Sequence, residues 1–170
     1  MFIGHIPAGY LWTHFFLRWS NGRIAGSRPG RVNILSGLIA SILPDFDLFY
    51  FYLIDHRQHL HHGYWTHIPA FWLCIMAVWI GIGWLTKHSR IIFSGAIIGS
   101  NIFLHLFLDT IVGDIRWLYP LSRQSFSFFH VPATFDWWVL SFILHWTFLF
   151  EVAIMGAAGY VFFCSRPSRT

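Results

Sequence analysis

Five apolar stretches separated by short polar breaks account for most of the chain. They cover residues 2–19, 32–54, 68–86, 91–112 and 137–164. A helix needs about 20 consecutive apolar residues to cross a bilayer, and most of the stretches approach or exceed that length. The pattern therefore predicts an all-α fold, a polytopic membrane helix bundle of four to five transmembrane helices.

The second stretch contains a clear internal break, Pro44-Asp45-Phe46-Asp47. A proline disfavours helical conformation in the residue before it, so we expect a helix that ends near Leu43. An aromatic run, residues 49–52, follows and is typical of a membrane interface. The first stretch, with Pro7 and Gly9 near its start and two histidines within it, is the least certain span.

The composition supports a membrane protein. Of the 170 residues, 56% are hydrophobic, 21% aromatic and 11% charged, whereas soluble domains contain about 25% charged residues. Disordered, fibrous and disulfide-scaffold classes are excluded. The net charge is +4, but the arginines lie in short turns and form no basic face for nucleic acid. We expect one integral membrane domain, residues 1–170.

Basic residues predict the orientation, because cytoplasmic loops carry an excess of Lys and Arg. Those between stretches one and two, between three and four, and in the tail fall on one side if five spans alternate: Arg18, Arg23, Arg28, Arg31, Lys87, Arg90, Arg166 and Arg169. Most of the histidines and aspartates then gather at the opposite, extracytoplasmic face. Such convergence of ionisable groups beside membrane spans predicts a functional pocket there.

The sharpest local pattern is His105-Leu106-Phe107-Leu108-Asp109 in the fourth stretch. A spacing of four places His105 and Asp109 on one helix face within about 6 Å. They can therefore share a metal ion or a proton. The alternative is that Asp109 only orients His105.

Asp45 and Asp47 form the second candidate element. They alternate in the turn after Pro44, where an extended backbone would direct both side chains to the same side. Two carboxylates at that separation repel each other unless they share a cation or a proton. The alternative is a helix cap or a turn that only needs polarity.

The third element is a histidine-rich window, residues 55–67. Imidazole suits zinc and other borderline divalent metals, and carboxylates complete a hydrolytic site. His67 opens the third stretch, so we expect it on a rigid element. His62 is interpreted as a ligand or an acid/base group, and His56, His59 and His61 as residues of an exposed loop.

These blocks resemble a known family, the YdjM-like, LexA-regulated inner-membrane metal-dependent hydrolases. The resemblance rests on Gly4-His5, Leu43-Pro44-Asp45-Phe46-Asp47, His62-x-x-x-Thr66-His67, and His105-x-x-x-Asp109 with Gly113 and Tyr119-Pro120. It covers about residues 1–120. It implies a metal-dependent hydrolase of the bacterial inner (cytoplasmic) membrane, with metal ligands His5, Asp45, Asp47, His62, His67, His105 and Asp109.

The chain departs from the family pattern at two places. The family's usual His-Arg-Gly-x-Thr-His-Ser is here His62-Gly63-Tyr64-Trp65-Thr66-His67-Ile68, without the Arg and the Ser. Leu48 stands where the family commonly has a histidine. The resemblance therefore supports a metal site better than it supports any particular substrate.

The number of candidate ligands exceeds one closed zinc shell of four. A looser similarity to zinc-dependent phospholipases C and helical nucleases, in the His-x-x-x-Asp pair, suggests two metals about 3.5–4 Å apart that share a carboxylate. We expect one to three ions, zinc or manganese, or one ion and a general base.

The expected function is hydrolysis of a membrane lipid or another amphiphile at its headgroup. We favour a phosphoester, because Arg116 and Arg123 follow the fourth stretch and arginine binds phosphate bidentately. Asp47 and His62 are the other candidate catalytic residues. His130 could protonate a leaving group, although an ordinary loop histidine is the simpler interpretation.

Two other functions remain open. A zinc lipid amidase of the ceramidase-like kind would use similar ligands and is distinguished by its substrate. A metal-ion transporter or sensor would need ligands that continue through the bilayer. His14, His145 and Glu151 are the only candidates for that path, and a structural role is the simpler interpretation of each.

Overall fold

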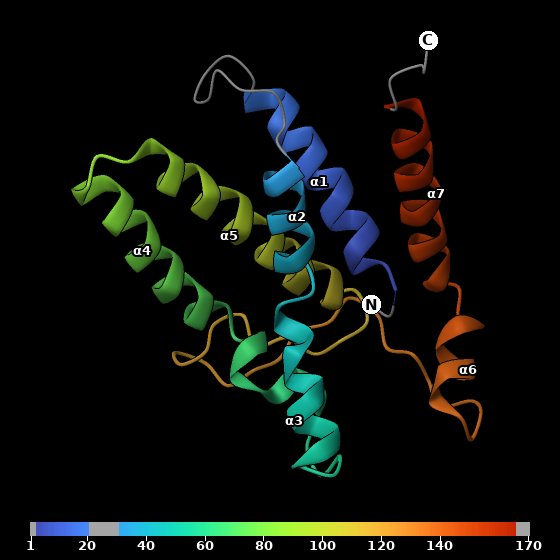
Figure 1. Cartoon of the computed structure of the whole chain (residues 1–170). Coiled ribbons are helices and arrows are strands. Elements are labelled where there is room, and N and C mark those ends of the chain that lie inside the picture. The colour runs from blue at the N-terminus through green and yellow to red at the C-terminus, as the bar shows by residue number, and fades with distance from the viewer. Residues whose placement is uncertain (1–2, 21–30, 166–170) are drawn as a thin grey trace.

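The computed structural model describes residues 3–20 and 31–165, and this part of the chain is helical, as predicted. Its α-helices are α1 (His5–Ser20), α2 (Arg31–Ala40), α3 (Asp47–Leu53), α4 (Pro69–Leu85), α5 (Ser89–Asp109), α6 (Trp138–Ile143) and α7 (Phe148–Cys164) (Figure 1). Three short 3-10 turns connect some of them: η1 (Pro44–Phe46), η2 (His61–Gly63) and η3 (Trp65–His67).

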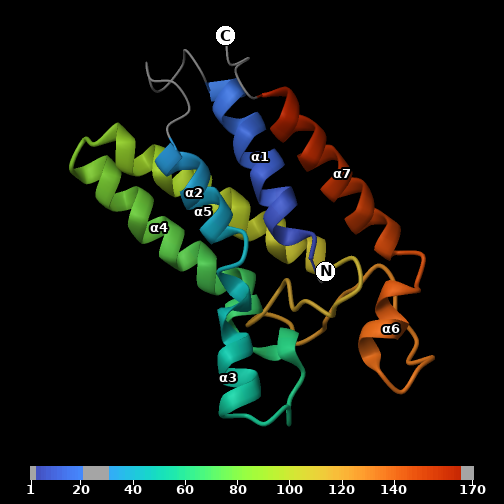
Figure 2. The same cartoon turned by 45° about the vertical axis from the view of Figure 1, so that its right-hand side comes forward.

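The helix α1 lies at the centre of the arrangement and contacts α2, α5 and α7. The helices α4 and α5 form an antiparallel hairpin that packs on α2, while α7 lies along the other side of α1 (Figures 1 and 2). The long connection after α5 is not helical. A single antiparallel bridge between Ile115 and Phe126 holds it together.

The core consists of two clusters of buried apolar side chains. One comprises Ala40, Trp72, Ile102 and Leu106, and the other comprises Leu17, Phe93 and Ile97. Trp72 also donates its indole N–H to the backbone carbonyl of Thr66, at 2.6 Å. This hydrogen bond ties the η3 turn to α4, so core packing also fixes the segment that carries His67.

The count of four to five spanning helices is not supported in the described part of the chain. By length and composition, α5 can cross a membrane, and a second span requires α2 to be taken together with η1 and α3 across a bend of 55°. The helices α4 and α7 are apolar but have 17 residues each. They reach only about 26 Å at 1.5 Å per residue.

Proline and polar residues explain the difference, since they cut the apolar stretches into shorter helices. The chain bends after Ala40, before Pro44. The last stretch, residues 137–164, breaks into α6 and α7 at residues 144–147. A hydropathy pattern counts apolar residues but does not show where the helix axis changes direction.

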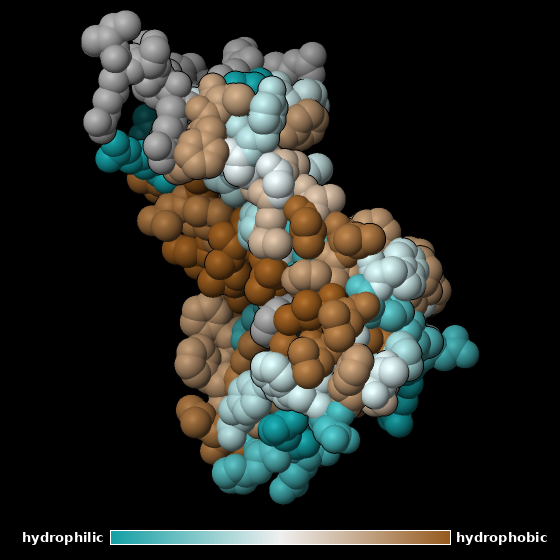
Figure 3. All heavy atoms as spheres, turned by 90° about the vertical axis from the view of Figure 1, so that its right-hand side faces the viewer, coloured by the Kyte–Doolittle hydropathy of each residue, from teal (hydrophilic) through white to brown (hydrophobic). Residues whose placement is uncertain are grey.

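Apolar and hydrophilic residues are segregated on the surface, as in an amphipathic molecule. On the face that carries α6 and α7, apolar residues form a band across the middle, and hydrophilic residues gather toward the end where α3 lies (Figure 3). The end of α1, the start of α2 and the α4–α5 turn lie away from that end. Arg18, Arg31 and Lys87 belong to these elements, whereas Arg23, Arg28, Arg166 and Arg169 lie outside the described residues.

Close contact between α1 and α2 depends on Gly37. A Cβ atom at this position would lie 3.0 Å from Cβ of Thr13 and closer still to its hydroxyl oxygen. Asn101 of α5 donates a hydrogen bond to that hydroxyl, at 3.0 Å, so Thr13 is held in place. Small residues permit such close helix contacts in membranes.

We expect Gly37→Ala to destabilise the protein by about 1–3 kcal/mol, because it overpacks the contact between α1 and α2. The measurement is thermal unfolding of the detergent-purified protein. The control is Gly156→Ala in α7, where a Cβ would meet nothing within 4 Å. Equal melting temperatures for Gly37→Ala and the control would contradict this account of the interface.

Candidate metal centre

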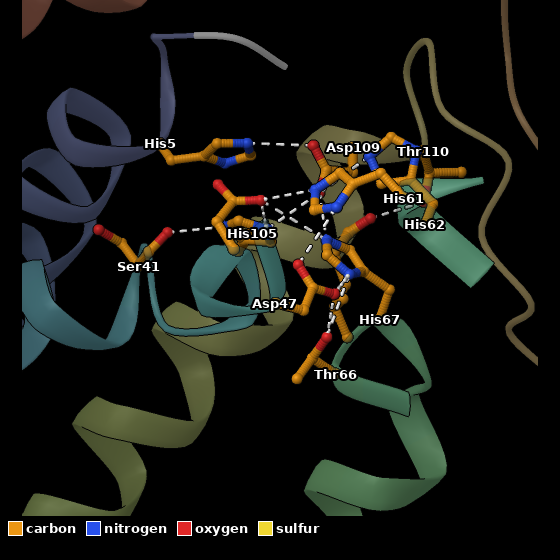
Figure 4. A network of polar contacts seen from close by, with 12 residues as sticks. His5, Ser41, Asp47, His61, His62, Thr66, His67, His105, Asp109 and Thr110 are labelled. Carbon is orange, nitrogen blue, oxygen red and sulfur yellow. Dashed lines mark hydrogen bonds and ion pairs between the residues drawn. The ribbon is translucent and has the colours of Figure 1, made fainter. Parts of the chain in front are cut away.

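The last turn of α5 carries the His105 and Asp109 pair that the spacing predicts to share a helix face. Nε2 of His105 lies 2.9 Å from Oδ2 of Asp109. Both side chains are buried, each with 1% exposure. Buried polar groups of this kind need partners, and the partners come from three other segments (Figure 4).

The turn after Pro44 differs from the extended conformation that we predicted. Pro44 begins the 3-10 turn η1, and Asp47 is the first residue of α3, with helical backbone angles. Asp45 and Asp47 therefore do not point to the same side. They contact opposite nitrogens of His67: Oδ1 of Asp45 lies 3.6 Å from Nε2, and Oδ2 of Asp47 lies 2.9 Å from Nδ1.

The histidine-rich window contributes three imidazoles from two consecutive 3-10 turns. His61 and His62 lie in η2 and His67 lies in η3. Their ring centroids are 4.6 to 5.0 Å apart. His67 is fully buried, with 0% exposure, so the expectation that it occupies a fixed position is consistent with the structure.

His5 is contributed by the first residue of α1. Its Nε2 lies 3.0 Å from Oδ1 of Asp109, and its ring stacks on that of His105 with centroids 3.8 Å apart. A residue exactly one hundred positions away from His105 is thus brought against it by the packing of α1 on α5.

Four donor atoms surround one point with the spacing of a metal site. They come from Asp45, His67, His105 and Asp109 and all lie within 4.8 Å of one another. Four of the separations are 3.6, 3.6, 3.5 and 2.9 Å. The edge of a tetrahedron around zinc, with bonds of 2.0–2.1 Å, is about 3.4 Å. The donors therefore fit a tetrahedral divalent ion.

The hydrogen bonds behind the two buried imidazoles support the same conclusion. Nδ1 of His105 lies 2.7 Å from the backbone carbonyl of Ser41, and Nδ1 of His67 lies 2.9 Å from Asp47. Each contact fixes the ring and leaves Nε2 as the inward atom, the arrangement typical of metal-binding histidines. Both Nε2 atoms face carboxylate oxygens of Asp45 and Asp109 at 2.9 to 3.6 Å, so imidazole and carboxylate donors point at the same place.

Asp47 therefore lies outside the four-donor group and contacts one of its members, His67, from behind. The Thr66 hydroxyl also donates a hydrogen bond to Asp47, which fixes the carboxylate in turn. The structure places the seven predicted ligands close together, but in different positions: four in one group, His5 on Asp109, Asp47 behind His67, and His62 at 3.8 Å from Asp109.

The surroundings of His67 and His62 shift the pKa of the two imidazoles in opposite directions. Burial disfavours the imidazolium of His67, but hydrogen bonds with Asp109, Asp45 and Asp47 outweigh it and raise its pKa well above the usual value. For His62, burial lowers the pKa to about 3, despite the attraction of Asp109. His62 is therefore a neutral potential ligand at neutral pH, and a cation can replace the proton on His67.

Sequence reasoning missed His61, which was assigned to an exposed loop with His56 and His59. The latter two are exposed as expected. His61 instead lies between two carboxylates, with Nε2 at 3.2 Å from Asp45 and Nδ1 at 3.2 Å from Asp47. Its position next to His62 and six residues before His67 was a usable signal, because 3-10 turns bring such residues together.

A cavity of about 520 Å³ opens beside the cluster. Its polar lining includes Asp45, His61, His62 and His130, and its apolar lining includes Leu48, Tyr52, Val112, Val131, Trp138 and Phe142. Neither Arg116 nor Arg123 is among the lining residues. The connection after α5 folds back on the end of that helix, because the Phe128 and Phe129 amides donate hydrogen bonds to the carbonyls of Thr110 and Ile111. His130, the next residue, therefore lies at the cavity.

Three polar residues inside the apolar stretches belong to neither group of candidate metal ligands: His14, His145 and Glu151. Glu151 of α7 is buried and accepts a hydrogen bond from the backbone N–H of Ile3, at 2.6 Å. His145 and Thr147 lie 2.8 Å apart, and His14 lies 3.3 Å from Ser165. These contacts are consistent with structural roles.

Fold and site together define a helical protein with a histidine and aspartate cluster at the end of its longest apolar helix. The profile of the YdjM inner membrane protein family matches residues 1–166. The chain therefore belongs to this family, and the resemblance noted in the sequence is confirmed. Comparisons with curated proteins and with solved structures gave no significant match.

We expect His105→Ala to abolish tight metal binding and Asp47→Asn to weaken it by about 10- to 100-fold, because one residue is a ligand and the other orients a ligand. The measurement is zinc titration of the purified protein by calorimetry. The matched control is Asp55→Asn, which removes a carboxylate that contacts His59 outside the cluster. Unchanged affinity in His105→Ala would remove that residue from the site.

Proposed function

We propose that this protein is a metal-dependent hydrolase of membrane amphiphiles. The observation that carries the proposal is the cavity, because its polar side consists of three cluster residues and His130, and its other side is apolar. A lipid has the same division into a polar headgroup and an apolar chain. A headgroup against Asp45 and His62 would place a chain beside Trp138 and Phe142.

The residues of the cluster have distinct roles in this proposal. Asp45, His67, His105 and Asp109 hold a divalent ion, zinc or manganese, while Asp47 and Ser41 orient the imidazoles. The ion, when bound, supplies a Lewis acid and lowers the pKa of coordinated water. His130 faces the cavity, where an imidazole can take a proton from the attacking water and the imidazolium so formed can give it to the leaving group. His62 beside it is either a metal ligand or a second group of this kind.

A phosphoester remains the favoured bond, although the geometry changes the argument for it. Arg116 and Arg123 do not line the cavity, so a role in phosphate binding would require the connection after α5 to rearrange. The preference rests on the number of carboxylate and imidazole donors, which exceeds one zinc shell of four and suits the two-ion sites of phosphatases and nucleases. The amidase alternative uses the same donors and is separated by assay.

Transport is less well supported than hydrolysis. A transit path needs ligands at several depths, but in the described ranges the groups that could hold a metal both lie at the cluster. His14, His145 and Glu151 contact other partners, as described above. This arrangement favours a site at one membrane face, which we assign to the extracytoplasmic side because of the basic residues at the opposite ends of the helices.

The position of the cavity is suited to a lipid substrate. Exposed aromatic side chains line it, Tyr52 and Trp138, or adjoin the lining in sequence, Trp137. Tyrosine and tryptophan are enriched at the level of lipid headgroups. The cavity would thus open where the headgroup of a bilayer lipid lies.

The first test is hydrolysis by the metal-loaded, detergent-purified chain. Mixed micelles would contain either a phosphoester lipid or an N-acyl amide lipid, and product release would be followed by mass spectrometry. We expect turnover of the phosphoester that chelation removes and that His105→Ala lacks. Turnover of the amide alone would favour the amidase, and no turnover of either class would contradict the proposal.

The second test concerns the apolar side of the cavity. Phe142→Ala should raise KM several-fold for a long-chain substrate and leave KM for a short-chain analogue unchanged, because about 1 kcal/mol of apolar contact is lost. The control is Leu149→Ala, an exposed residue of α7 outside the cavity. Equal KM values for both chain lengths in Phe142→Ala would show that chains do not bind there.

A further inference from the structure

We propose that His61 and His62 form a second metal site beside the four-donor site and share the carboxylates of Asp45 and Asp109 with it. The inference rests on the proposed metal centre and does not depend on the proposed hydrolysis. It assigns a role to His61, which the sequence pattern does not single out.

The donor atoms of the cluster fall into two groups, each with all its members within 4.8 Å. One group is Asp45, His67, His105 and Asp109, the other is His61, His62 and His67, and they share His67 alone. Atoms bound to one zinc ion lie at most about 4.2 Å apart, twice the bond length. Because the six residues do not form a single group, one ion does not reach all of them. Nε2 of His67 faces the first group and its Nδ1 contacts Asp47, so the proposed second site takes its carboxylates from the separate contacts of His61 with Asp45 and of His62 with Asp109.

His61 is oriented in the same way as the buried ligand His67. The two oxygens of Asp47 contact Nδ1 of both rings: Oδ2 lies 2.9 Å from His67, and Oδ1 lies 3.2 Å from His61. In both rings Nε2 then faces Oδ1 of Asp45, at 3.6 and 3.2 Å. A carboxylate behind an imidazole whose other nitrogen faces a shared donor is the usual support of a metal ligand.

His62 approaches the second shared carboxylate, Asp109, with its Nε2 at 3.8 Å from Oδ2. The backbone provides the room for this ring. A Cβ atom at Gly113 would lie 2.6 Å from Nδ1 of His62, so a larger residue there would displace the ring. The separations of 3.2 and 3.8 Å between these imidazoles and the carboxylates bracket the spacing of about 3.4 Å between ligands of one zinc ion.

The two sites differ in their access to the cavity. His67, His105 and Asp109 are buried, whereas His61, His62 and Asp45 line the cavity. The second ion would therefore lie between the four-donor site and the space assigned to the substrate. Imidazole with carboxylate suits zinc, manganese or iron(II), and two ions that share carboxylates bind both ends of a phosphoryl group.

The test is the metal content of the full-length chain, purified in detergent, loaded with Mn²⁺ and freed of excess metal. We expect about two ions per chain in the wild type and about one in the double variant His61→Ala/His62→Ala. The matched control is His56→Ala/His59→Ala, which removes two exposed histidines of the same window and should retain both ions. Circular dichroism and thermal unfolding check that each variant folds.

Electron paramagnetic resonance gives an independent readout. Two Mn²⁺ ions about 3.5–4 Å apart are magnetically coupled, so the wild type should show a coupled spectrum and the double variant the six-line spectrum of an isolated ion. His61→Gln, a smaller change than truncation, should lower the affinity of the second ion only.

Each other outcome decides against the inference. One ion per chain in both the wild type and the double variant would overturn the second site and leave the proposed hydrolase intact. Loss of all metal in the double variant would show that the histidines belong to a single site. A wild type without metal would overturn the metal centre itself, and with it the proposed function.

Discussion

Burial of carboxylates among imidazoles is the interaction on which the site end of this protein depends. Asp47 and Asp109 lie at 7% and 1% exposure, in surroundings where an isolated carboxylate would be strongly destabilising. Their imidazole partners come from α1, η2, η3 and α5. Each of these segments must therefore end at the same place, which explains why helix ends and short turns converge there.

The same constraint accounts for the irregular elements. A regular span through residues 32–54 would carry Asp45 and Asp47 along one helix, away from His67. The bend before Pro44 and the 3-10 turn η1 instead present Asp45 to one nitrogen of His67 and Asp47 to the other. Because the helix through residues 32–54 is interrupted, polar side chains from several segments can gather at its end.

The proposed function rests on the placement of that cluster beside an apolar wall. The core helices fix the buried donors, and the connection after α5 together with α6 supplies the opposite side of the cavity. Many binding sites combine side chains held by a rigid scaffold on one side with a loop on the other. In the proposed hydrolase, this division would keep the candidate metal ligands fixed while the apolar side fits the chain of the substrate.

Local sequence patterns determined the helical class, the break at Pro44 and the proximity of His105 and Asp109, because these depend on helix periodicity and on proline sterics over a few residues. The family followed from the same short motifs. The number of spans did not, since hydropathy does not register a bend of the helix axis.

Only the tertiary structure decided which of the candidate metal ligands lie close together in space. His5 reaches Asp109 only because α1 packs on α5, and His61 differs from the exposed His59 only because η2 folds back on Asp45 and Asp47. Arg116 and Arg123, close to the cluster along the chain, lie outside the cavity lining for the same reason. Distances between residues far apart in sequence are set by how helices pack and turns close, and composition and spacing do not encode them locally.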